Sequence, residues 1–210
     1  AGDSTAGGAA APLSSVSFES ALPLQPSATA NAAAAAGLLS LQVPVRLFCF
    51  HYAGGNASVF ETWQADFDAL FGAGSAASVE VCAVEIPGHG RRRGEEPVDD
   101  LGALLALIRA ELDALPPMPY CLVGYSFGCL LAYELGRLLA AAGRPPLHLF
   151  VASESAPQVV TPDVDPDLED EEFVRQLSSF GQIRQEVVAA GPQIWPVLLR
   201  PYRADLVIEK

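Results

Sequence analysis

From residue 45 onward, short apolar runs alternate with longer segments in which apolar positions recur every three or four residues. The short runs, which predict strands, are 45–50, 79–88, 120–124 and 147–153. The helical patterns occupy 59–71, 99–117 and the segment from Phe127 to Gly143, where a glycine predicts the helix end. This order predicts βαβ units joined by right-handed crossovers, and therefore a mainly parallel sheet with helices on both faces.

The first part of the chain shows no such pattern. Residues 1–42 are rich in Ala, Ser, Pro and Gly without sustained periodicity, and we interpret them as a disordered tail or linker. Residues 43–210 suffice for one domain. No Lys or Arg precedes the Ala-rich apolar stretch of the tail, so we assign no targeting signal, and no apolar run is long enough to span a bilayer.

Composition limits the classes of partner and cofactor. The net charge of −13, with only 12 Lys and Arg, argues against nucleic-acid binding. We find no metal-ligand cluster and no phosphate-binding glycine loop with a following Lys, so we expect no bound cofactor. Four cysteines lie inside apolar runs without paired spacing, which indicates buried thiols in a reducing, cytoplasmic setting: Cys49, Cys82, Cys121 and Cys129.

The segment 124–128, Gly-Tyr-Ser-Phe-Gly, lies between a predicted strand and a predicted helix. This is the position of the nucleophile elbow in α/β-hydrolases, where small flanking residues permit a sharp, strained turn. Ser126 is therefore our candidate nucleophile, and the alternative is a serine that only caps the helix. The loop after the first strand, "HYAGG", offers free backbone N–H groups, so we expect the amides of Ala53 and Phe127 to form an oxyanion hole.

The three histidines are not obvious bases for Ser126. We expect His51 to orient the glycine loop rather than act as the base, and His89 to lie in a loop that lines the entrance to the site. His148 falls inside a predicted strand and is interpreted as a packed core residue.

Four segments together are similar to the type II thioesterases that accompany polyketide synthases and non-ribosomal peptide synthetases. They are "FCFHYAGGNASVFETW", "VEIPGHGRR", "LVGYSFGCLLAYELGRLL" and "DEEFVRQLSSFG". The resemblance covers about residues 45–210 and implies an α/β-hydrolase fold with a small helical lid at about 157–205. It also implies a serine hydrolase that forms an acyl-enzyme and removes acyl groups from the phosphopantetheine arm of acyl or peptidyl carrier proteins, or from small acyl thioesters.

The family's catalytic acid and histidine follow later strands, and this chain stops before a matching segment. We therefore expect a C-terminally incomplete hydrolase fold with the nucleophile but not the base. Glu154, after the fourth predicted strand, is a weaker candidate for the acid, and Asp205 is weaker still. Two alternatives stay open: a hydrolase-fold binding module without catalytic activity, or a carboxylesterase or lipase-like hydrolase.

Substrate or carrier contacts are expected near the same edge of the sheet, since ligands bind at the carboxyl ends of parallel strands. Tyr52 and His89 are candidates. The run Arg91, Arg92 and Arg93 would suit an acidic carrier protein or a phosphate group, and the alternative is a solvated loop balanced by neighbouring glutamates.

Overall fold

The computed structural model describes residues 43–152, 164–181, 183 and 185–210. The whole predicted tail (1–42), the candidate acid Glu154 and the beginning of the expected lid (157–163) thus lie outside the described residues. All described residues belong to one unit of the chain, 41–210.

Four parallel strands form a sheet with the order β2-β1-β3-β4. Their bounds are Val45–Phe50 (β1), Val79–Ala83 (β2), Tyr120–Tyr125 (β3) and Leu149–Ala152 (β4). Every residue of β1 is buried, as its mainly apolar sequence predicts, and the one charged residue, Arg46, pairs with Glu80. Because the strands are parallel, the loops that follow β1 and β3 leave the sheet at the same edge.

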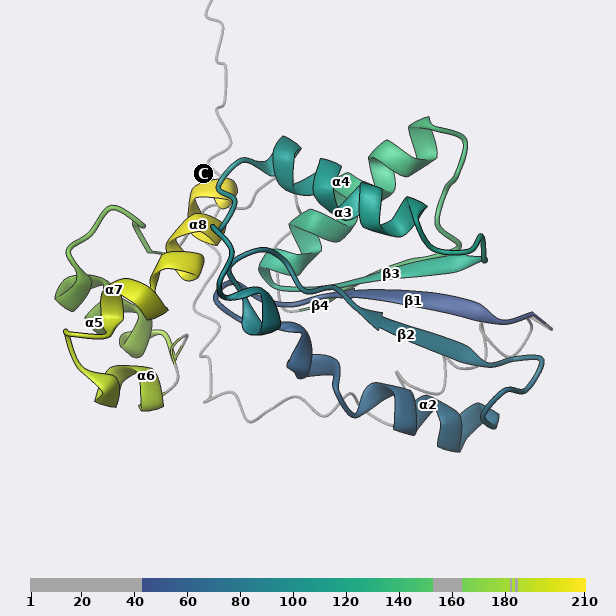
Figure 1. Ribbon diagram of the computed structural model, residues 1–210, viewed down its shortest axis with the longest axis horizontal. Helices are drawn as coiled ribbons and strands as arrows, with labels where there is room; N and C mark the ends of the chain where they lie inside the picture. Colours follow the sequence, from purple (N-terminus) through teal and green to yellow (C-terminus); the bar gives the residue numbers. More distant parts are fainter. Residues whose placement is uncertain (1–42, 153–163, 182, 184) are drawn as a thin grey trace, which may run out of the picture. The chain divides into compact units, whose positions relative to one another are not determined.

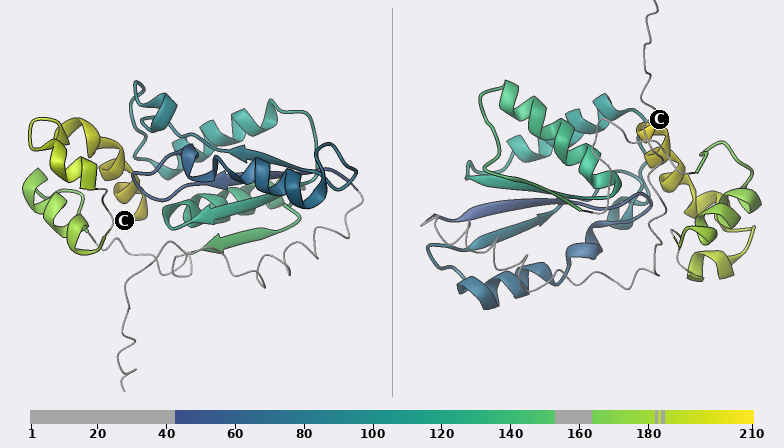
Figure 2. Two further views of the ribbon diagram at one scale, coloured as in Figure 1. Left: turned by 90° about the horizontal axis from the view of Figure 1, so that it is seen from below. Right: turned by 180° about the vertical axis from the view of Figure 1, so that it is seen from behind.

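Helices cover both faces of this sheet, as predicted. The helix α2 (Trp63–Phe71) lies on one face, and α3 (Leu101–Asp113) and α4 (Phe127–Ala141) lie on the other (Figure 1). The two further views show the same arrangement (Figure 2). The strand order explains it: the step from β1 to β2 runs in one direction along the sheet and the step from β2 to β3 runs back, so right-handed crossovers place their helices on opposite faces.

The ends of α3 show how local sequence sets the helix bounds. Asp100 is the N-cap, and its carboxylate accepts a hydrogen bond from the Ala103 N–H at 2.7 Å. The helix ends at Asp113, earlier than the predicted 117, because Pro116 and Pro117 cannot continue it. Its buried residues recur at helical spacing and join the main core: Leu104, Leu105, Ile108 and Leu112.

Three other element predictions need correction. The expected strand 79–88 ends at Ala83. The Val84 N–H makes the last hydrogen bond to β1, to Cys49 O at 2.9 Å, and β1 itself ends at Phe50. The expected helix 59–71 is split into a 3₁₀ turn, η1 (Ala57–Phe60), and α2. β4 begins at Leu149, so His148 precedes the strand and is exposed rather than packed in the core.

The C-terminal part of the described chain is helical, as expected for the lid. Its helices are α5 (Asp170–Ser179), α6 (Gln185–Ala190), α7 (Trp195–Leu198) and α8 (Arg200–Glu209). Three acidic residues occupy the first turn of α5, where they interact favourably with the helix dipole. Phe173 of α5 and Tyr202 of α8 pack edge to face with ring centroids 5.9 Å apart, and both belong to the main core.

Candidate active site

Ser126 occupies a sharp turn between β3 and α4. Its backbone angles are φ 52° and ψ −123°, and it is the only non-glycine residue with positive φ in the described part of the chain. Such a conformation costs about 1–3 kcal/mol and persists only where the surrounding structure enforces it. Here the Ser126 N–H donates to Ala152 O at 2.9 Å and the Cys129 N–H donates to Ser126 O at 2.7 Å, so hydrogen bonds on both sides hold the turn.

The two glycines that flank Ser126 are required by close backbone packing. A Cβ atom at Gly124 would overlap the backbone of Gly128 and Cys129, and one at Gly128 would overlap the carbonyl groups of Phe50 and His51. The side chain of Ser126 makes no capping bond to the first turn of α4. These observations favour a nucleophile elbow over a helix cap.

The expected oxyanion donors lie beside this turn. Phe127 is the first residue of α4, so its N–H has no acceptor within the helix, and the positive end of the helix dipole lies there. Ala53 is buried in the loop that follows β1. Neither amide donates a hydrogen bond to another described residue, which leaves both available to a substrate oxygen.

Ser126 opens into a pocket of about 460 Å³ between the sheet edge and the C-terminal helices. Its lining residues are Tyr52, Ala53, Gly54, Tyr125, Ser126, Gly181, Ile183, Val187, Leu198, Leu199 and Tyr202. Tyr52 and Tyr125 pack edge to face with ring centroids 5.4 Å apart. A cavity of about 570 Å³ lies elsewhere, next to Arg46 and Tyr120 at the start of β1 and β3, and contains no candidate nucleophile. The candidate nucleophile therefore identifies the Ser126 pocket, rather than this cavity, as the candidate active site.

The expectation that His89 lines the entrance is wrong, because its side chain is buried. Its Nε2 lies 3.0 Å from Asp205 Oδ2, and its Nδ1 donates to Pro87 O at 3.0 Å. Burial alone would lower the pKa of His89, but the hydrogen bond and the charge of Asp205 outweigh it and raise that pKa above its usual value. His89 is thus committed to Asp205.

His51 is buried as well, and its Nδ1 donates to Tyr52 O at 2.9 Å, as expected for a residue that orients the loop. Its ring centroid lies 5.1 Å from that of His89. Burial lowers the pKa of His51, and the nearby charge of His89 lowers it further. The two adjacent histidines therefore have pKa values shifted in opposite directions.

Asp205 is the main residue whose position sequence reasoning missed. It is 1% exposed and accepts hydrogen bonds from the Gly54 N–H at 2.8 Å and from His89. The available signal was its position in α8, where Tyr202 and Leu206 are buried on either side of it in sequence. An acidic residue on the buried face of an amphipathic helix needs a partner, and the sequence did not identify which.

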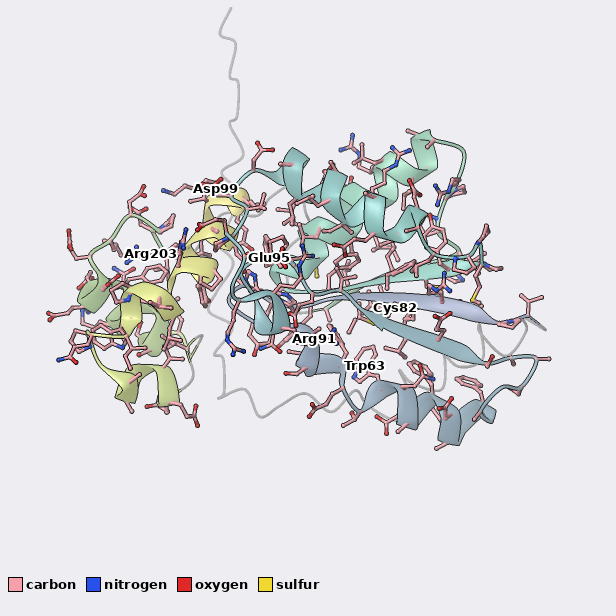
Figure 3. All side chains as sticks on the ribbon, viewed as in Figure 1. Trp63, Cys82, Arg91, Glu95, Asp99 and Arg203 are labelled. Carbon is pink, nitrogen blue, oxygen red and sulfur yellow. The ribbon has the colours of Figure 1, made fainter. Side chains whose placement is uncertain are left out.

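The three arginines differ in their surroundings. Arg92 binds Glu95 at 2.7 Å, Glu111 at 2.8 Å and the backbone carbonyl of Glu85 at 3.0 Å, so it holds its own loop together. Arg91 is 84% exposed and Arg93 is also exposed. Arg91 and Glu95 both project from this loop between β2 and α3 (Figure 3). The expectation that all three arginines are free to contact a carrier protein is thus corrected, because only Arg91 and Arg93 face solvent.

Other kinds of site find little support in the described part of the chain. It contains no cluster of three or more His, Cys, Asp or Glu able to hold a metal ion. None of its helices is both long and apolar enough to cross a membrane. Cys49, Cys121 and Cys129 are buried, as expected, whereas Cys82 is only partly so.

Comparison with known proteins places this site in a family. A family model described as a thioesterase domain matches residues 45–209. The gramicidin S biosynthesis protein GrsT of Aneurinibacillus migulanus is 33% identical over 78% of this chain and 61% of its own length. LgrE of Brevibacillus parabrevis, described as a linear gramicidin dehydrogenase, is 32% identical over 81% of this chain and 63% of its own length.

Solved structures agree with these matches. RedJ, solved with a polyethylene glycol molecule in its active site, is 31% identical with a TM-score of 0.67 over 93% of this chain and 69% of its own. The type II thioesterase BorB from the borrelidin biosynthetic cluster is 28% identical with a TM-score of 0.61, over 80% of this chain and 62% of its own. The chain thus spans less than two thirds of the length of GrsT and LgrE. The fold is of the α/β-hydrolase type. Because the family model matches most of its length, this chain belongs to the thioesterase domain family.

Proposed function

We propose that this domain acts as a type II thioesterase, which hydrolyses acyl groups from the phosphopantetheine arm of acyl or peptidyl carrier proteins. The observation that carries the proposal is the strained Ser126 turn, which opens into a pocket next to two available amides. The similarity to BorB, a type II thioesterase from the borrelidin biosynthetic cluster, supports the same class of activity.

This geometry supports the following proposed reaction. Ser126 Oγ attacks the thioester carbonyl carbon, and the amides of Ala53 and Phe127 stabilise the negative charge that develops on the carbonyl oxygen. The C–S bond then breaks, the pantetheine sulfur leaves as a thiol after taking up a proton, and the acyl group stays on Ser126. Water attacks this ester, which releases the carboxylic acid and restores the serine hydroxyl.

The base that takes the serine proton is not assigned to a histidine of this chain. His89 is bound to Asp205, His51 uses its Nδ1 for Tyr52 O, and His148 is exposed before β4. By resemblance to the family, the acid and the histidine belong to later strands. The proposed reaction therefore needs to be tested both on this chain and on the whole product of its gene.

The phosphopantetheine belongs to the substrate, so the proposed reaction needs no cofactor from the protein. The lid residues Ile183, Val187 and Leu198 give the pocket apolar walls that suit an acyl chain. We propose carrier-bound acyl thioesters as the main substrates and small acyl thioesters as weaker ones. A cytoplasmic location stays a prediction from the sequence.

The test is hydrolysis of acyl-pantetheine and acyl-carrier thioesters, with Ser126→Ala as the matched control. We expect thiol release that depends on Ser126 and exceeds release of alcohol from simple esters of the same acyl group. Preference for the simple esters would favour a carboxylesterase. Tight carrier binding without any turnover, in both this chain and the whole gene product, would favour a hydrolase-fold binding module.

A further inference from the structure

The direction of the Ala53 N–H is set by the peptide bond that it shares with Tyr52. The Tyr52 carbonyl accepts two hydrogen bonds, from the Gly55 N–H at 2.9 Å and from His51 Nδ1 at 2.9 Å. In a planar trans peptide the C=O and the following N–H point in opposite directions. Two donors that hold the Tyr52 carbonyl on one side therefore point the Ala53 N–H to the other.

The next peptide bond is held by Asp205, which lies far away in the sequence. The Gly54 N–H donates to Asp205 Oδ2 at 2.8 Å, and the same oxygen lies 3.0 Å from His89 Nε2. His89 is fixed in turn, because its Nδ1 donates to Pro87 O. Gly54 adopts φ 68°, a left-handed conformation that glycine accepts readily. The loop, the segment after β2 and α8 thus meet at one carboxylate.

A second buried carboxylate supports the same loop farther along. Glu85, whose side chain is 8% exposed, accepts hydrogen bonds from the Ala57 N–H at 3.0 Å and the Arg91 N–H at 3.1 Å. Both carboxylates therefore bind backbone N–H groups of the loop after β1 and hold the segment after β2. These contacts leave the amide of Ala53 without a partner among the described residues.

We propose that Asp205 and His89 are positioning residues for thioester hydrolysis. This buried pair fixes the Ala53–Gly54 peptide and so anchors the loop in which the preceding Tyr52–Ala53 peptide points the Ala53 N–H at the substrate oxygen. This inference rests on the proposed function. The cost of removing two charges from water commonly cancels the attraction between them, so a buried pair of this kind adds little to stability. We therefore assign the pair a role in geometry. What the pair provides is a fixed geometry for a group that must not reorganise during the reaction.

The surrounding charges are consistent with this role. His89 faces Asp205, His51 and Glu85. Burial alone would lower the pKa of His89, and the hydrogen bond and charge of Asp205 raise it above its usual value. Both ring nitrogens of His89 lie next to oxygen acceptors, which suits a protonated ring. His51, with a lowered pKa, suits a neutral ring whose single proton on Nδ1 goes to Tyr52 O.

The experiment compares Asp205→Asn and His89→Gln with a control ion pair in the same lid. Asp205→Asn keeps the shape of the side chain and removes its charge. The control is Asp170→Asn, which breaks the bond of Asp170 to Arg203 at 2.8 Å, between α5 and α8, and does not touch the loop. The two readouts are hydrogen exchange of the Gly54 amide and the separate kcat and KM for an acyl-pantetheine thioester.

We expect Asp205→Asn and His89→Gln each to speed hydrogen exchange of the Gly54 amide about tenfold. Each should also lower kcat about 10- to 100-fold with little change in KM, because the Ala53 amide acts on the transition state. Asp170→Asn should change neither quantity. Unchanged Gly54 exchange in folded Asp205→Asn and His89→Gln would overturn the proposal, and so would faster exchange with an unchanged kcat. If neither this chain nor the whole gene product has activity, the proposed function fails, and Gly54 exchange alone decides whether the pair holds the loop.

Discussion

The ring of Tyr202 occupies the space in which a side chain at Gly54 would lie. A Cβ atom at Gly54 would overlap the ring, and Gly54 also adopts a positive φ of 68°. The helix α8 and the loop after β1 are therefore in direct contact, so one methyl group on the loop would collide with the Tyr202 ring. Packing by Tyr202 and the hydrogen bond to Asp205 thus both join α8 to the loop that carries the proposed oxyanion donor Ala53.

Gly54→Ala should therefore destabilise the protein and lower kcat together. Its matched control is Gly143→Ala, because Gly143 has a similar φ of 75° but no atom within 4 Å of the added Cβ. Both substitutions pay for the strained backbone, and only Gly54→Ala adds the collision. We expect its free energy of unfolding to fall by about 2 kcal/mol more than that of the control, measured by urea denaturation. Equal losses would mean that Tyr202 moves aside without cost.

Gly128→Ala should disrupt the elbow itself, since its Cβ would meet backbone atoms of Phe50 that cannot rotate away. The control is Gly102→Ala, at an exposed position of α3 where the closest neighbour is the Asp100 carboxylate. In a helix, alanine is favoured over glycine by about 1 kcal/mol, so the control should be neutral or stabilising. Gly128→Ala should lose about 2 kcal/mol or more, and labelling of Ser126 by a fluorophosphonate should slow. Normal labelling in a folded Gly128→Ala protein would contradict this account of the turn.

The two buried histidines should give opposite pH dependences of stability. The pKa of His89 is raised on folding, so its contribution is fully present below the unfolded value of about 6.5 and is lost as pH rises through the folded-state pKa. The pKa of His51 is lowered, so stability is lost as pH falls below about 6.5. The difference in unfolding free energy between the unsubstituted protein and His89→Gln should therefore shrink toward alkaline pH.

For His51→Gln the same difference should shrink toward acid pH. Urea denaturation of all three proteins from about pH 5 to 9 measures both trends, and that range brackets the ordinary histidine pKa. Subtracting the unfolding free energy of each variant from that of the unsubstituted protein cancels the contributions of the other titrating groups, provided that each variant stays folded. Parallel curves for the two variants would contradict the opposite protonation states assigned to the two rings.

Much of this architecture was predictable because local sequence determines it. The buried run of β1, the spacing of apolar residues in α3 and the glycines around Ser126 each specify their own conformation through short-range packing and sterics. The early end of β2 was missed, since it depends on where β1 stops pairing with it. The split of the expected 59–71 helix was missed because the apolar spacing continues across it. Element ends follow tertiary context more than sequence pattern.

The site could be predicted only in part for the same reason. Ser126 and Phe127 lie in one recognisable turn motif, and Ala53 lies in the glycine-containing loop after β1, so sequence sufficed to propose all three. The bond between Asp205 and His89 joins residues 116 positions apart, and neither residue has a local pattern that names its partner. Arg92 was misjudged likewise, because Glu111, which neutralises it, lies on α3 rather than in the same loop.

Lid residues should set which acyl chains the pocket accepts. Val187 lines the Ser126 pocket, whereas Val197 on α7 is 72% exposed and lines no part of it. Val187→Trp should therefore lower kcat/KM for long-chain acyl-pantetheine about tenfold while it spares acetyl-pantetheine, and Val197→Trp should leave both unchanged. The ratio of kcat/KM for the long-chain substrate to kcat/KM for acetyl-pantetheine does not depend on the fraction of active protein in a preparation. Equal losses for long and short chains would show that the acyl chain does not lie against α6.

Carrier binding, finally, should depend on the two exposed arginines and not on Arg92. We expect Arg91→Glu with Arg93→Glu to raise KM for an acidic carrier-bound thioester about 3- to 10-fold, an effect that salt reduces, and to leave acyl-pantetheine kinetics unchanged. The control reverses the same number of charges elsewhere, at Arg109 on α3 and Arg137 on α4, which are 44% and 63% exposed. A similar rise in KM for both pairs would mean that the carrier responds only to net charge. Arg92→Glu should instead lower the melting temperature, because it leaves Glu95 and Glu111 facing a third negative charge.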